Sequence, residues 1–167
     1  MTTLGHELRL VQNPALGAVV LWRFARKYSE SHALRAAAPL PLCALVLPMV
    51  WHAETADNIA STREGSGLRA FADKFSDTNA SHLDALLALH SRASRWRSKT
   101  MEALRMGFGS NLLRLDDKGG LIASDSAWSP AAHTQPVRIQ TNAAEKLGTW
   151  FAAMSLQEIS VALHVRF

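Results

Sequence analysis

The sequence predicts a mainly helical protein that folds as one compact multi-helix domain, residues 1–167, with a single β-hairpin. Its 167 residues are close to the usual length of one domain. Hydrophobic residues make up 48% and charged residues 19% of the chain, which is the composition of a globular protein. Most segments repeat their apolar residues at helical spacing. Because the charged fraction lies below the usual share of about a quarter, we expect some apolar surface to stay uncovered for a partner.

The first predicted helix runs from the Asn-Pro pair at 13–14 to about Ser31, since asparagine caps helices well and proline suits their first turn. In a helical projection, Leu16 and Val19 fall on the polar side of this helix and Trp22 falls on its flank. The helix is therefore apolar nearly all round in its first half. Burial inside the domain would explain this. The alternative, which we carry forward as a hypothesis, is that these three side chains contact another protein.

The middle of the chain contains further predicted helices over Leu42–His52 (interrupted at Pro48), residues 54–60, Leu68–Phe75, and Ser81 to about Phe108. The apolar seam of the last and longest helix is predicted to consist of Leu83, Leu86, Leu87, His90, Met101, Leu104 and Phe108. Two polar residues, His90 and Arg97, interrupt this seam. Such polar breaks are typical of a helix bend or a buried pair, and less often of a seam shared with another chain.

A loop is predicted over Ser61–Gly67, where glycines allow an adaptable backbone. Arg63 and Arg69 place positive charge in and beside this loop, which suits a carboxylate or a phosphate. We expect the loop either to contact a partner or to be an ordinary exposed connection.

The last third of the chain combines a hairpin with two helices. Residues 111–115 and 120–124 flank the turn 116–119, which is the pattern of a β-hairpin. After a loop over 126–136, a helix is predicted from Thr141 to Met154. Ser155 and Glu158 then form a capping box that opens a last short helix.

A stripe of basic residues on the long helix suggests contact with a nucleic-acid backbone. Arg92, Arg95 and Lys99 share one helical face, and Lys118 lies on the hairpin. A basic helix beside a basic hairpin is how a winged helix meets DNA, which makes a winged-helix relationship one hypothesis for this fold. The alternative is a solvated polar face. The final segment looks like the first half of a helix-turn-helix without its recognition helix, so we expect no reading of bases.

Catalytic chemistry is not indicated. His52 and Glu54 match half of a zinc deaminase signature, but the paired cysteines that this site needs are missing. Cys43 is the single cysteine and lies in an apolar run, where a thiolate is disfavoured. The seven histidines lack metal-binding spacing, and no phosphate-binding loop is present. We therefore expect no enzyme activity, no metal and no cofactor.

No feature indicates a membrane or a secreted protein. The longest apolar run, residues 36–51, is short for a membrane span and contains three prolines. The N-terminal residues lack the pattern of a signal peptide. A cytoplasmic location is therefore expected.

Several stretches together resemble a known family. They are Asn13–Phe24, Pro39–Pro48, Gly67–Phe71, Ala144–Phe151 and Val165–Phe167. This pattern is similar to the middle component of bacterial three-component ABC systems, of which Lamassu-type defence against phage and plasmids is an example. The matching residues are apolar and structural, so no active site carries over.

The resemblance implies two protein partners and a role between them. One partner is an ABC-type ATPase of the structural-maintenance-of-chromosomes kind, and the other is an effector, commonly a nuclease. The expected function is then a non-catalytic bridging subunit that contacts DNA, if at all, through the assembled complex. The alternative is a free-standing winged-helix transcriptional regulator, which should form a homodimer and bind a palindrome.

Overall fold

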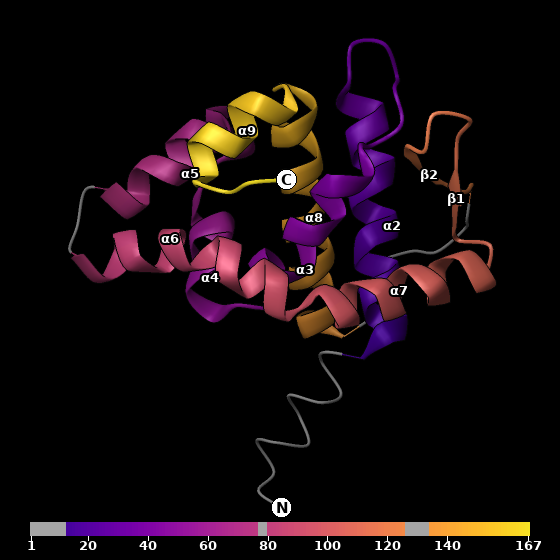
Figure 1. The fold of residues 1–167 in the computed structure, drawn as a ribbon, viewed down its shortest axis with the longest axis horizontal. Helices are drawn as coiled ribbons and strands as arrows, with labels where there is room; N and C mark the ends of the chain where they lie inside the picture. The colour runs from indigo at the N-terminus through magenta and orange to yellow at the C-terminus, as the bar shows by residue number, and fades with distance from the viewer. Residues whose placement is uncertain (1–12, 77–79, 126–133) are drawn as a thin grey trace, which may run out of the picture.

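The computed structural model describes residues 13–76, 80–125 and 134–167. Within these residues the chain forms eight α-helices, a 3-10 turn and one antiparallel hairpin (Figure 1). Their bounds are α2 Pro14–Ser31, α3 Leu40–Val50, α4 Ala53–Ser61, η1 Glu64–Ser66, α5 Gly67–Ser76, α6 Ala80–Arg95, α7 Arg97–Gly109, β1 Leu113–Leu115, β2 Leu121–Ala123, α8 Gln135–Ala152 and α9 Leu156–Leu163. The predicted mainly helical fold with one hairpin is confirmed.

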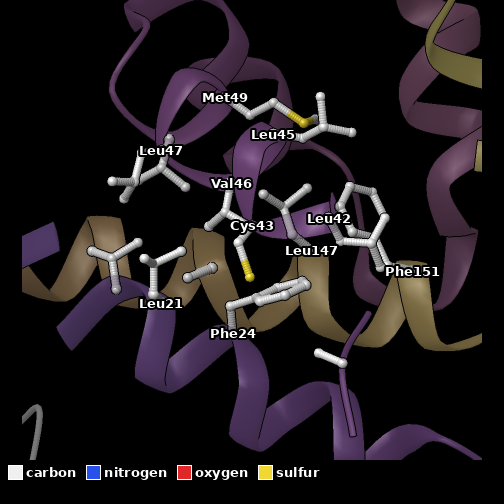
Figure 2. Packing of buried hydrophobic residues seen from close by; sticks show 14 of the residues in the cluster. Leu21, Phe24, Leu42, Cys43, Leu45, Val46, Leu47, Met49, Leu147 and Phe151 are labelled. Carbon is white, nitrogen blue, oxygen red and sulfur yellow. The ribbon is translucent and has the colours of Figure 1, made fainter. Parts of the chain in front are cut away.

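The core is built around α2, which packs along α8 and against α7, β2 and α3. Figure 2 shows Leu21 and Phe24 of α2 facing Cys43 of α3, with Leu147 and Phe151 of α8 beside them. All five side chains are buried. The helices α2 and α8 approach so closely that a Cβ atom at Gly148 would lie 2.8 Å from the carbonyl oxygen of Phe24. A glycine is therefore required at this contact.

Two predicted caps are present. The Asn13 side chain accepts a hydrogen bond of 2.7 Å from the backbone N–H of Leu16, which starts α2 as predicted. Ser155 and Glu158 form the capping box of α9. The predicted interruption at Pro48 is wrong, because α3 continues through it to Val50. This proline lies in the last turn, where it removes one backbone hydrogen bond from a helix that is about to end.

The single long helix predicted from Ser81 to Phe108 is wrong, because the chain breaks at Trp96 into α6 and α7. The Trp96 ring packs 5.6 Å from the ring of Trp51, measured between centroids. The Trp51 Nε1–H donates in turn to Gln140 Oε1 at 2.7 Å. Tertiary packing of two tryptophans thus replaces the continuous helix that local spacing favoured.

The break also changes which residues are buried. Leu89 and Arg92 of α6 are buried, whereas Leu87 and His90, assigned to the predicted seam, are exposed. On α7 the predicted seam holds for Leu104. The direction in which α6 faces the core was therefore predicted incorrectly, since a kink rotates one helix relative to the next.

The hairpin has the predicted position, with Leu113, Arg114 and Leu115 opposite Ala123, Ile122 and Leu121. An isolated antiparallel bridge joins Leu121 to Ala38 and attaches the hairpin to the segment before α3. Helix α8 starts at Gln135, earlier than the predicted Thr141, because Pro136 fits its first turn. Part of the predicted loop over 126–136 lies outside the described residues.

Candidate protein-interaction surface

The predicted contact surface on α2 is only partly available in the structure. Trp22 is fully buried, and its Nε1–H donates a 2.9 Å hydrogen bond to the carbonyl oxygen of Ser124. The hypothesis that Trp22 contacts another protein is therefore wrong, because the side chain is a central core residue. Leu16 and Val19 are half-buried. Other elements pack against α2 on several sides, which explains why this helix is apolar nearly all round.

The loop over Ser61–Gly67 is held against α8 by two backbone carbonyls. The Trp150 Nε1–H donates to Glu64 O at 2.7 Å, and Lys146 Nζ donates to Thr62 O at 2.9 Å. Arg63 and Arg69 are exposed. The Arg69 guanidinium lies 3.5 Å from a carboxylate oxygen of Glu158. Arg63 in this loop and Arg69 in the first turn of α5 are thus both open to solvent, next to a segment that α8 holds in place.

The basic stripe predicted on the long helix is not continuous. Arg92 is only 6% exposed, and its Nη1 donates to Thr55 Oγ1 at 3.2 Å. Burial, reinforced by the nearby Arg95, lowers the pKa of the Arg92 guanidinium. The hypothesis that Arg92 touches a nucleic-acid backbone is therefore wrong, since the group is enclosed by the protein.

The other members of the stripe are exposed but separated. Arg95 ends α6, and Lys99 lies on α7 with its Nζ 5.0 Å from the centroid of the Trp96 ring. Lys118 lies in the hairpin turn, beyond the opposite end of α7 (Figure 1). This helix has 13 residues and is roughly 20 Å long. Contact with all three cations would therefore require an extended partner.

The structure also has an open groove on its surface that the sequence prediction missed. It encloses about 570 Å³ and is bounded by α3, the end of α6, α7, β1 and the C-terminal segment. Four large hydrophobic side chains line it while staying well exposed: Leu40 at 37%, Met101 at 45%, Leu115 at 48% and Phe167 at 50%. Its lining also includes Ala44, Leu45, Leu104, Phe108 and Val165. The groove is therefore an apolar surface of the kind that marks an interaction site.

The charged side chains of this groove are all basic. Arg97, Arg166 and His90 line it, and no aspartate or glutamate is among the described lining residues. Neither arginine forms an ion pair within the part of the chain that the structure describes. The backbone N–H of Arg166 donates to His90 Nδ1 at 3.4 Å, which ties the C-terminal segment to α6. The low charged fraction and the polar breaks at His90 and Arg97 are the sequence signals of this site.

The family model of the "ABC-three component (ABC-3C) system Middle Component 3" matches the chain over residues 1–167. The chain belongs to this family of middle components. The resemblance inferred from the sequence is confirmed at this level. No curated protein and no solved structure matched the chain.

The one cysteine of this middle component has no nucleophilic character. Cys43 is buried beneath the groove, and desolvation raises the pKa of its thiol to about 12. Figure 2 shows its sulfur directed toward Phe24 in the core. A thiol with that pKa stays protonated at neutral pH and does not attack an electrophile.

The half signature at His52 and Glu54 has a structural explanation. His52 Nδ1 lies 3.1 Å from Thr55 Oγ1 and caps the start of α4. Burial, with a smaller effect of Arg92, lowers the pKa of the His52 imidazole. Among the described residues, no three histidine, cysteine, aspartate or glutamate side chains are grouped so that they would hold a metal ion.

None of the described helices is long and apolar enough to cross a bilayer.

Proposed function

We propose that this middle component is a non-catalytic bridging subunit that links an ABC-type, SMC-like ATPase to an effector, commonly a nuclease. We place it in the cytoplasm, in a Lamassu-type defence system against phage or plasmids. The observation that carries the proposal is the apolar groove. A chain with a complete core of its own still exposes four large hydrophobic side chains in one place.

The energetics of the groove support a bound partner. Exposed apolar surface gains roughly 25 cal/mol for each Å² that a partner removes from water. A monomer that worked alone would gain nothing from leaving Met101, Leu115 and Phe167 in solvent. A subunit of a larger assembly buries them when the complex forms.

Two exposed arginines belong to the proposal as a second contact. Arg63 lies on the loop that α8 holds in place, Arg69 lies in the first turn of α5, and their guanidinium groups suit carboxylates of a partner. Leu16 and Val19 are half-buried on α2, so each offers only part of its side chain to a partner in the same proposal. One partner at the groove and another at the loop would give the subunit its bridging geometry.

Contact with a DNA backbone through the complex is the third part of the proposal. Arg95, Lys99 and Lys118 are the exposed cations that would make it. Each phosphate neutralised adds about −0.9 to the slope of log affinity against log salt for duplex DNA. Their combined replacement by glutamine should flatten that slope by about 2 to 3. A matched change of Arg105 and Arg114 to glutamine should leave it unaltered; equal slopes for both variants would end the DNA proposal.

Reconstitution tests the bridging function. The chain is co-expressed with the ATPase and the effector encoded beside it, and assembly is followed by size-exclusion chromatography with light scattering. We expect one complex with all three proteins, and no stable association of ATPase with effector when the middle component is omitted. If the chain instead forms a homodimer, binds neither partner and protects a palindromic DNA site, the result would support a transcriptional regulator.

A further inference from the structure

We propose that the apolar groove binds an amphipathic α-helix of a partner subunit, and that the polar flank of this helix is acidic. The inference rests on the proposed bridging function and adds the chemistry of one of its partners. It follows from three properties of the groove: what its floor is made of, which hydrogen-bonding groups it offers, and which charges line it.

The floor of the groove is suited to a row of apolar side chains. Leu45 of α3, Leu104 of α7 and Val165 of the C-terminal segment line the groove although they are buried, and Ala44 of α3 lines it half-buried. Helices that dock in such grooves place residues i, i+3, i+4 and i+7 on the floor. The exposed hydrophobic residues at the edges would then cover the sides of the docked helix.

The hydrogen-bonding needs of the backbone indicate whether the bound segment is a helix or a strand. A strand leaves N–H and C=O groups that need partners, and the groove is lined mainly by apolar side chains. The adjacent edge of β1 is only three residues long, so strand addition would gain few hydrogen bonds. A helix satisfies its backbone internally. The groove therefore favours a helix.

The charged residues that line the groove indicate which charge the polar flank of the bound helix carries. His90, Arg97 and Arg166 are the titratable side chains that line the groove besides the buried thiol. The nearest acidic residue on α7, Glu102, lines a separate hollow with Arg105 and Met106. An acidic flank would pair with the two arginines, whereas a basic flank would be repelled. The protein as a whole carries a formal charge of +4, which acts in the same direction.

A pair of methionines on one helix provides the first test. Met101 lines the groove and Met106 does not, yet they are 45% and 46% exposed. Five positions apart on a helix, they point roughly 140° away from each other. Met101→Glu places a carboxylate in the apolar contact and should weaken the assembled complex by at least about thirtyfold, the size of an interface hot spot. Met106→Glu should leave the affinity unchanged.

Charge reversal provides the second test. The double variant Arg97→Glu and Arg166→Glu should slow association several-fold and remove most of its dependence on salt, because rim charges act mainly on the association rate. Arg105→Glu, on α7 outside the groove, is the control. Faster association of the double variant would mean that the occupant is basic and would overturn the proposal.

Cross-linking identifies the occupant directly. A photoreactive phenylalanine at position 101 is activated in the complex reconstituted from the three proteins, and the attached peptide is sequenced by mass spectrometry. We expect a partner segment with apolar residues at helical spacing and acidic residues beside them. A cross-link to a second copy of this chain, to a lipid, or to a segment without this pattern would refute the docked helix.

The failures of the two proposals are distinguishable. If the three proteins assemble and Met101→Glu binds as tightly as the unchanged chain, the bridging function stands and the groove proposal fails. If the unchanged chain binds neither the ATPase nor the effector, the bridging function itself fails.

Discussion

For helix α2 a partner contact was one hypothesis, whereas the groove was not predicted from the sequence. The all-round apolar surface of α2 was a candidate interface, but α8, α7, β2 and α3 enclose it. The groove is bordered by the polar residues His90 and Arg97, yet it holds exposed hydrophobic side chains. A continuous apolar run marks burial among many neighbours. The groove that we propose as the docking surface instead combines exposed apolar residues with isolated cations.

The largest loss of stability should come from removing the largest buried side chain of α2. Trp22→Ala removes a fully buried indole and leaves the carbonyl oxygen of Ser124 without its hydrogen bond. We expect the free energy of unfolding to fall by about 3–5 kcal/mol, measured by urea denaturation. A loss below about 1 kcal/mol would mean that α2 is less enclosed than the structure places it.

A smaller effect should follow from separating α2 and α8. A Cβ atom at Gly148 would lie 2.8 Å from Phe24 O and 2.9 Å from Tyr28 N. Because backbone atoms move reluctantly, Gly148→Ala should cost about 1–3 kcal/mol in the same assay. Gly109→Ala at the end of α7, where an added Cβ meets nothing within 4 Å, is the control and should be near neutral.

The pH dependence of the free energy of unfolding tests the packing between α4 and α6. The folded protein lowers the pKa of His52, so the unfolded chain binds a proton more readily. Stability from this group is complete above about pH 6.5, the ordinary histidine pKa, and should decline as the pH falls below it. His52→Gln should reduce that slope between pH 7 and 5.5 in thermal unfolding. An unchanged slope would assign the dependence to other groups.

The smallest effect on stability is expected in the groove. Met101→Ala and Leu115→Ala shorten side chains that are nearly half exposed. Unfolding free energies should change by no more than about 0.5 kcal/mol, although we expect the same changes to weaken partner binding. A loss as large as that of Trp22→Ala would make the groove part of the core.

Local signals in the sequence predicted much of the fold. The Asn-Pro start of α2, the capping box at Ser155 and the hairpin turn each depend on neighbours within a few residues, so they were found. The break at Trp96 was missed because it depends on Trp51, which is distant in the sequence. Because the break was missed, the buried face of α6 and the burial of Arg92 were also predicted incorrectly.

The candidate site was harder to predict for the same reason. The groove forms from α3, α7, β1 and the C-terminal segment, and only the folded chain brings them together. Two signals did point toward it: the low charged fraction of the chain and the arginine in the seam at position 97. Neither could show that the apolar surface lies there and not on α2.

Methionine oxidation tests most directly whether the groove is the docking surface. In the free chain, dilute peroxide should oxidise Met101 and Met106 at similar rates and spare the buried Met49. In the complex with the ATPase and the effector, Met101 should be protected several-fold while Met106 stays reactive. Equal oxidation of Met101 in the free and assembled protein would show that the groove stays open, and the docking surface would then have to lie elsewhere.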